Sequence, residues 1–183
     1  YGREIITSKE EQEEYYKEDT REPYSQIVSP EPNNWFKNSF QIKVLDEDLN
    51  SGIRNDTCQY KVISYNKNYQ EVSTDWKSRK CNDYQLISIG PEGDCQFNGR
   101  NSCWVYVRCQ DKAGNWHTPS EGGFSIRSYN IDFLDPQFNQ VEIKKKDSQF
   151  NFQFQVKDNT KIEGCFLYLN GEQQDLMNFK NED

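Results

Sequence analysis

The sequence predicts an all-β protein organised as a β-sandwich, and three observations support this prediction. Short runs of residues alternate between apolar and polar side chains, which is the period of a half-buried strand. Turn-forming residues gather between these runs, at 50–52, 90–94 and 98–101. The chain has 183 residues, of which 33% are hydrophobic and 14% aromatic, a composition that favours strands over helices.

The alternating runs can be taken in chain order, and each predicts a strand with one buried face. The first covers 40–44, where Phe40, Ile42 and Val44 share a face, and the second covers 58–62. The third covers 103–109, with Cys103, Val105, Val107 and Cys109 on the inner face and Trp104, Tyr106 and Arg108 on the outer face.

The stretch after the third strand predicts a hairpin turn rather than a catalytic site. Asp111 can accept backbone N–H groups at the first turn position, Gly114 tolerates a positive φ, and Asn115 is at ease in the left-handed region. We expect a last strand to follow and to end near residue 126. His117, the only histidine, has no serine or cysteine placed beside it as a nucleophile.

The chain also repeats itself, which predicts a second copy of the same domain. Residues 40–46 read FQIKVLD and residues 152–158 read FQFQVKD, and a cysteine-bearing stretch follows each, at Cys58 and at Cys165. The predicted divisions are 1–23, 24–126 and 131–183, the last being an incomplete copy. We expect either a segment cut from a longer tandem array or a second chain that supplies the missing strands.

Residues 1–23 differ from the rest, with eight acids and four bases. They predict an acidic linker or short solvated helix, or alternatively a strand near Ile5 and Ile6 that another molecule accepts. Because the chain starts at Tyr1 without a charged and apolar leader, we expect a processed product or an excised segment.

Composition excludes several functional classes. The net charge of −8 and the isoelectric point near 4.8 argue against a nucleic-acid partner. No apolar run reaches the roughly 18–20 residues that span a bilayer, so no membrane span is expected. The six cysteines lack the paired C-x-x-C spacing of zinc sites, and so they predict disulfides and an extracellular location.

A set of short motifs then suggests a family. In order they are Asp48-Leu-Asn-Ser-Gly-Ile53, Cys58-Gln-Tyr60, Asp75-Trp76, Arg79-Lys-Cys81, Gly93-Asp-Cys95, Gly99-Arg-Asn-Ser-Cys103, Val105-Tyr-Val107 and Asp111-Lys-Ala-Gly-Asn115. Together they resemble the bacterial and archaeal immunoglobulin-like domains that occur in tandem on large cell-surface proteins. The resemblance covers residues 24–126 and, in part, 131–171. It implies an immunoglobulin-like β-sandwich, and it says little about function because such domains serve as spacers, adhesin stalks and filament subunits alike.

The resemblance also implies a disulfide pairing, Cys58 with Cys81 and Cys95 with Cys103. Cys109 would then remain a small buried apolar residue, where relatives tend to carry alanine, and Cys165 would be unpaired or would bond to a residue outside this sequence. A competing pairing joins Cys58 to Cys109 and leaves Cys81 exposed.

Three further candidate sites each have a plainer alternative. A calcium site could form at Asp46 and Asp48, which share a turn with Glu47 and Asn50. Asp132 and Asp135, near the junction of the two copies, could also contribute ligands. Acidic residues are common in turns without any metal, however, and we expect no cofactor. Asn55 begins an N-x-T sequon and could carry a glycan. Trp104, Tyr106 and Arg108 could form an interaction face or could merely cover a neighbouring strand.

These features predict a structural extracellular protein, part of a cell-surface stalk, adhesin or filament, whose partners are neighbouring domains or subunits. One alternative is a self-polymerising subunit that donates a strand from its N-terminal segment. Another is a carbohydrate- or protein-binding module that uses the Trp104 face. No paired acid and base, activated nucleophile or metal cage is evident, so we do not expect an enzyme.

Overall fold

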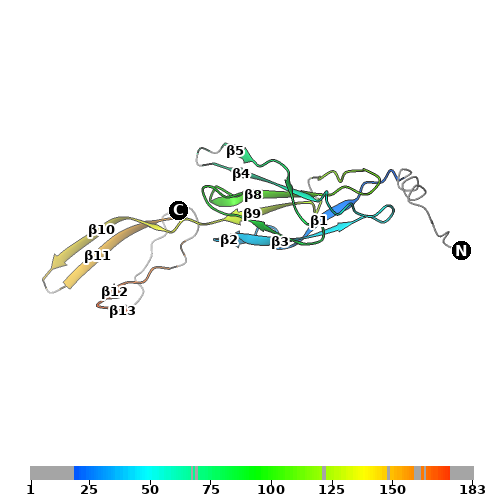
Figure 1. Ribbon diagram of the computed structural model, residues 1–183. Helices are drawn as coiled ribbons and strands as arrows, with labels where there is room; N and C mark the ends of the chain where they lie inside the picture. The colour runs from blue at the N-terminus through cyan, green and yellow to red at the C-terminus, as the bar shows by residue number, and fades with distance from the viewer. Residues whose placement is uncertain are drawn as a thin grey trace. The chain divides into compact units, whose positions relative to one another are not determined.

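The computed structural model describes residues 19–66, 68, 70–120, 123–147, 149–158, 162 and 164–173 (Figure 1). They belong to two compact units, of which unit 1 ends at Phe133 and unit 2 begins at Leu134. Every regular element in the described ranges is a β-strand, which confirms the all-β prediction. Within these ranges, no helix has the length and apolar character that a bilayer crossing requires.

Unit 1 contains two sheets that face each other across one core, forming a β-sandwich. The first sheet has the order β1-β3-β7, comprising β1 (Tyr24–Ser29), β3 (Phe40–Glu47) and β7 (Tyr84–Ile87). The second has the order β2-β9-β8-β4-β5, comprising β2 (Trp35–Phe36), β9 (Ile126–Ile131), β8 (Gly99–Arg108), β4 (Gln59–Tyr65) and β5 (Glu71–Ser73), and β6 (Lys77–Ser78) also pairs with β4. Only β2 and β9 pair in parallel among these strands.

The core lies where the alternating runs predicted it. Phe40, Ile42 and Val44 on β3 are at most 7% exposed, and the inward positions of β4 and β8 are similarly buried. Aromatic rings close one end of the core, because Phe36 stacks on Phe40 with ring centroids 3.9 Å apart and Tyr129 meets both rings edge-on.

The last strand of unit 1 lies further along the chain than the sequence predicted. β9 begins at Ile126, where we expected the strand to end, and Tyr129, Asn130 and Ile131 at its end are all buried. Three consecutive buried residues break the period of two, which explains why the strand escaped detection. The predicted boundaries at 126 and 131 are therefore too early, since Ile131 belongs to the core of unit 1.

Unit 2 contains two hairpins. β10 (Gln137–Lys146) pairs with β11 (Gln149–Lys157), and β12 (Tyr168–Leu169) pairs with β13 (Glu172–Gln173). The hairpin β10–β11 has the register of β1–β3, including an irregularity at the same place. Ile27↔Val44 and Ser29↔Lys43 flank the shift in unit 1, and Phe138↔Val156 and Gln140↔Gln155 flank it in unit 2. Val44 and Val156 hold the same position in the repeated sequences FQIKVLD and FQFQVKD.

Candidate functional site

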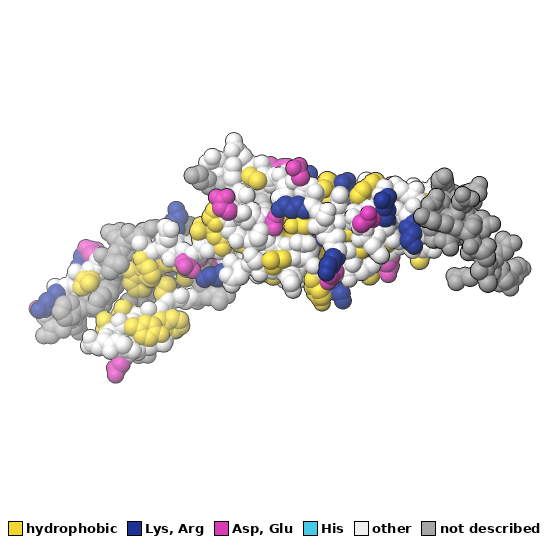
Figure 2. All heavy atoms as spheres, in the orientation of Figure 1, with side chains coloured by type: hydrophobic (Ala, Val, Ile, Leu, Met, Phe, Trp, Pro, Cys, Tyr) yellow, Lys and Arg dark blue, Asp and Glu magenta, His cyan; other side chains and the backbone are white. Residues whose placement is uncertain are grey.

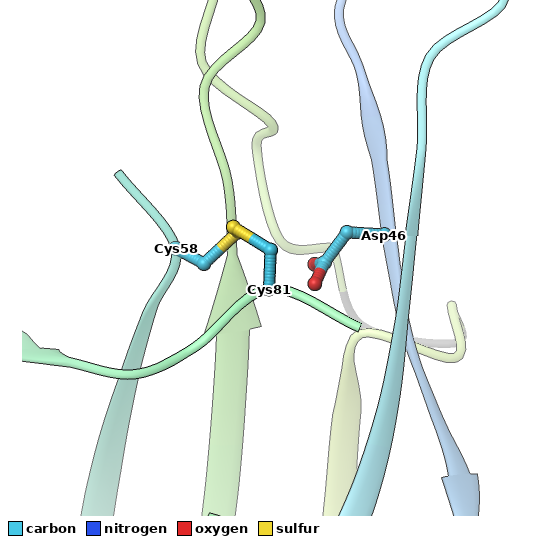
Figure 3. Close-up of side chains that lie close together, drawn as sticks. All are labelled: Asp46, Cys58 and Cys81. Carbon is cyan, nitrogen blue, oxygen red and sulfur yellow. A yellow bond between two sulfur atoms is a disulfide. The ribbon is translucent and has the colours of Figure 1, made fainter. Parts of the chain in front are cut away.

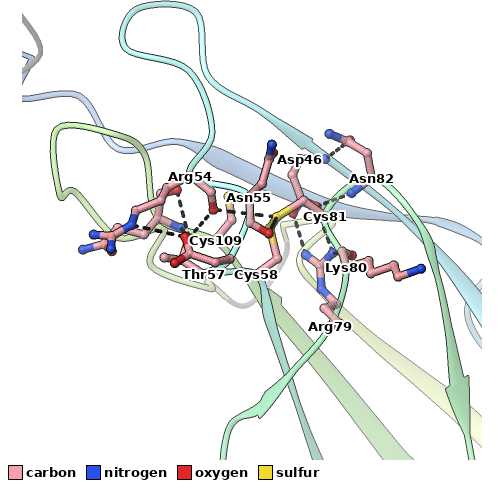
Figure 4. The surroundings of a disulfide bond; sticks show 12 residues. Asp46, Arg54, Asn55, Thr57, Cys58, Arg79, Lys80, Cys81, Asn82 and Cys109 are labelled. Atoms are coloured by element: carbon pink, nitrogen blue, oxygen red, sulfur yellow. Dashed lines mark hydrogen bonds and ion pairs between the residues drawn. A yellow bond between two sulfur atoms is a disulfide. The ribbon is translucent and has the colours of Figure 1, made fainter. Parts of the chain in front are cut away.

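The loop that leads into β7 is fastened to the rest of unit 1 by three different kinds of bond. We call residues 79–87 the latch segment. Its Cys81 forms a disulfide with Cys58, which directly precedes β4, and its Arg79 forms an ion pair with Asp46 on β3 (Figure 4). Its last four residues, β7, pair antiparallel with the start of β3. The latch segment therefore ties the second sheet to the first.

The ion pair between Arg79 and Asp46 is buried on both sides. Their side chains are 1% and 0% exposed, and two hydrogen bonds of 2.8 and 2.5 Å join the guanidinium nitrogens to the two carboxylate oxygens. The Asp46 carboxylate also accepts hydrogen bonds from the Ser25 hydroxyl, at 2.6 Å, and from the Asn82 backbone N–H, at 2.9 Å. Burial alone would raise the pKa of Asp46, but these donors, led by Arg79, lower the pKa overall.

The Asp46 oxygens already accept hydrogen bonds from Arg79, Ser25 and Asn82, so a calcium ion at Asp46, the less favoured of the two alternatives, would have to displace these donors. Asp46 also lies next to Cys58 and Cys81 (Figure 3), but the two sulfur atoms are bonded to each other and cannot act as thiolate ligands.

The second disulfide joins Cys95 to Cys103, so the structure contains the pairing that the resemblance implied. Cys109 keeps a free thiol, and Cys58 lies opposite it across β4 and β8, one step beyond the pair Gln59↔Arg108. This closeness explains why the competing pairing was reasonable. Cys109 is fully buried, and burial raises its pKa to about 12, so its thiol is unreactive near neutral pH.

The predicted turn after β8 forms as expected at Asp111 and Gly114. One carboxylate oxygen of Asp111 accepts the backbone N–H groups of Gly114 and Asn115 at 2.7 and 2.8 Å, and Gly114 has a φ of 101°. Asn115 is not among the described residues with positive φ. Instead its side-chain amide donates to the backbone oxygens of Asp19 and Arg21, which fixes the segment that precedes β1.

The same turn brings together an acidic cluster that sequence reasoning missed. Carboxylate oxygens of Asp19, Asp48 and Asp111 lie within 4.8 Å of one another. Each already accepts protein hydrogen bonds, for example Asp48 from the Gly52 N–H at 2.6 Å and Asp19 from the Ser51 N–H at 3.1 Å. The cluster therefore has a structural role in ordering loops, and of the predicted calcium pair only Asp48 belongs to it.

The outer face of β8 is engaged within the domain. The Arg108 guanidinium lies between the rings of Trp76 and Trp116, 4.0 and 4.6 Å from their centroids, and donates to the Gln59 side chain at 2.9 and 2.7 Å. The Trp104 indole N–H donates to a backbone oxygen at 2.9 Å. Trp104, Tyr106 and Arg108 are half-buried, and Arg108 is held in the stack with the two tryptophans, so part of the predicted interaction face is engaged within unit 1.

The remaining predicted positions lie in loops. Asn55 is exposed in the turn before Cys58, and its glycosylation stays a prediction. His117 is half-buried, its Nδ1 lies 3.0 Å from the Pro23 backbone oxygen, and burial lowers its pKa. The strand predicted near Ile5 and Ile6 falls outside the described residues.

Unit 2 also contains an apolar hollow. This hollow of about 500 Å³ is lined by Pro136, Phe138, Phe154, Val156, Ile162, Gly164, Cys165, Phe166, Leu167 and Tyr168. Figure 2 shows hydrophobic side chains at the surface of this unit, beside the strands β10–β13. Phe138 is 64% exposed and Cys165 is half-exposed with a free thiol.

The chain matches no protein-family model, no curated protein and no solved structure. Its function must therefore be inferred from its own residues and geometry.

Proposed function

We propose that this chain is a structural part of an extracellular, cell-surface protein, built from immunoglobulin-like domains in tandem. One observation carries the proposal: β1–β3 and β10–β11 pair in the same register, with the irregularity at the same position. Two antiparallel strand pairs agree in this detail most simply when they begin two copies of one domain type.

The strand order supports the immunoglobulin-like assignment. β1, β3 and β7 correspond to one sheet of such a domain, and β4, β8 and β9 correspond to the central strands of the other. The short strand β2 pairs with β9, so the first segment of the chain contributes to both sheets.

An extracellular location is supported by the two disulfides, which persist in oxidising compartments. A spacer role is favoured over a binding module because Arg108 is held between Trp76 and Trp116 and the Trp104 indole donates to the backbone, so a ligand would have to displace these contacts. That the chain is not an enzyme stays a prediction.

Mechanical stretching of the chain between two reference domains tests the proposal. The disulfides close loops of 23 and 8 residue steps. At about 3.5 Å per residue, these loops contain roughly 100 Å of chain that cannot be extended while the disulfides are intact. A load-bearing unit 1 should unfold in one resisted step, and that step should lengthen by roughly 100 Å after reduction. Extension without measurable resistance would refute a spacer role.

A further inference from the structure

The disulfide that fastens the latch segment has a third cysteine beside it. Cys58 directly precedes β4 and Cys109 directly follows β8, and the two residues are opposite each other, one step beyond the pair Gln59↔Arg108. Both side chains are 0% exposed. Residues directly opposite each other in an antiparallel pair point to the same face of the sheet. The free thiol of Cys109 therefore lies next to the disulfide between Cys58 and Cys81 (Figure 4).

The backbone hydrogen bonds show that Cys58 and Cys109 face each other in the geometry that a disulfide needs. The Cys109 oxygen accepts the His117 N–H at 2.9 Å, and the Cys58 oxygen accepts the Arg79 N–H at 2.9 Å, so neither carbonyl bonds to the opposite cysteine. In such a non-hydrogen-bonded pair the Cα atoms are about 4.5 Å apart and the side chains approach most closely. This separation falls within the range of about 4.4–6.8 Å that is usual for a disulfide.

We infer that these three cysteines form a disulfide switch, in which Cys58 exchanges its partner Cys81 for Cys109. The Cys109 thiolate attacks the Sγ of Cys58, a new Sγ–Sγ bond forms, and the bond between Cys58 and Cys81 breaks. Cys81 leaves as a thiolate and takes up the proton that Cys109 lost, so the step consumes no oxidant and no reductant. The inference does not depend on the tandem-copy proposal, because all three cysteines belong to unit 1.

The surroundings of Cys109 keep the exchange slow at neutral pH. Burial raises the pKa of its thiol to about 12, and the charge of Asp46 acts in the same direction, whereas Ser25 and Arg79 oppose the shift. Only a thiolate attacks a disulfide. The pairing of Cys58 with Cys81 is therefore protected kinetically, and a rising pH should release it.

The exchange replaces a buried thiol with a thiol at the surface of the latch segment. Cys81 is half-exposed, and its Sγ lies 3.3 Å from the Asn55 backbone oxygen. After the exchange the latch segment keeps the ion pair of Arg79 with Asp46 and the pairing of β7 with β3, but it loses its covalent bond to the residue before β4. Unit 1 then presents a cysteine that external reagents can reach.

Alkylation followed by peptide mapping without reduction tests the switch on the full 183-residue chain carrying Cys165→Ser, which removes the other free thiol. With excess iodoacetamide between pH 7.5 and 9.5, we expect the label on Cys81 together with a disulfide between Cys58 and Cys109. The rate should rise about tenfold per pH unit over the whole range, because the thiolate fraction of Cys109 does so below its pKa of about 12. Reaction through unfolded chains would instead level off near the ordinary thiol pKa of about 8.5.

Two variants in the same Cys165→Ser background supply the controls. Cys109→Ala removes the attacking thiol, so Cys81 should stay unlabelled at every pH. Cys81→Ser, refolded in a mixture of reduced and oxidised glutathione, should contain a disulfide between Cys58 and Cys109, because the strand pairing already places these residues together.

Three results would each overturn the inference. The first is the absence of label on Cys81 in the parent chain, including the case in which Cys109 is labelled and Cys58 stays bonded to Cys81. The second is equal labelling of Cys81 in Cys109→Ala, and the third is two free thiols in refolded Cys81→Ser. None of these outcomes bears on the register shared by β1–β3 and β10–β11, so the proposed function is tested separately.

Discussion

The ion pair between Arg79 and Asp46 allows a prediction whose sign and size both follow from the structure. Replacing Arg79 with methionine leaves the Asp46 carboxylate buried, 0% exposed, with only Ser25 and Asn82 to bind it. Removing one member of a buried pair typically costs about 3–5 kcal/mol. For a domain of this size, a loss of about 3–5 kcal/mol lowers the melting temperature by roughly 15–25 °C.

The contribution of Asp46 to the free energy of unfolding should depend on pH in opposite directions in the native protein and in Arg79→Met. In the native protein the pKa of Asp46 lies below its usual value, so its contribution to stability is present above the unfolded pKa, near 4, and is lost as the pH falls. In Arg79→Met, burial without the guanidinium should raise the pKa of Asp46 above the unfolded value. The variant should therefore be destabilised most at neutral pH and least at pH 3–4.

Urea unfolding followed by tryptophan fluorescence, at several pH values between 3 and 7, measures both effects. The informative quantity is the difference between the native protein and the variant, because other carboxylates, such as Asp94 beside Lys77, contribute their own acid sensitivity to both proteins. Arg79→Lys is the matched control, since it keeps the charge but loses the paired hydrogen bonds. A loss below about 1 kcal/mol in Arg79→Met, or an unchanged pH profile, would show that the pair does not hold the latch segment.

Three further predictions concern other parts of the chain. A thiol reagent at pH 8 should label one cysteine per native chain, Cys165, and a second, Cys109, only in denaturant, because burial raises the pKa of Cys109 to about 12; two fast thiols in the native state would contradict its burial. Asp111→Ala should lower the free energy of unfolding by about 2–3 kcal/mol, and Asp111→Asn by clearly less, because the amide oxygen can still accept the turn N–H groups; equal losses would refute this account. Arg108→Lys should cost about 1–2 kcal/mol and alter the fluorescence of Trp76, since lysine cannot stack between two indoles; an unchanged spectrum would contradict the stack.

The strands that could be predicted from the sequence are those whose burial follows a strict period of two. β3, β4 and β8 have this pattern, and their buried faces agree with the prediction. The apolar alternation is not visible in the sequence of β1, because one of its two buried positions is Ser25, a polar residue whose hydroxyl binds Asp46. The alternation is also absent from β9, because three consecutive residues of this strand are buried.

The contacts that fasten the domain could not be predicted, because they join residues far apart in the chain. Asp46 and Arg79 are 33 residues apart, and nothing local in either sequence points to the other. Asp46 in a run of acidic residues therefore suggested calcium. The stack at Arg108 likewise combines Trp76 and Trp116 from separate segments. The disulfides were easier to anticipate, since the family resemblance implied their pairing, although the alternative of Cys58 with Cys109 stayed open.

The latch segment shows why these long-range bonds are needed. β7 has only four residues, and a strand that short makes too few backbone hydrogen bonds to offset the entropy lost when its connection is ordered. The disulfide closes 23 residue steps and contributes about 3 kcal/mol by restricting the unfolded chain. The ion pair then sets the position of the segment, so the strand pairs in one register.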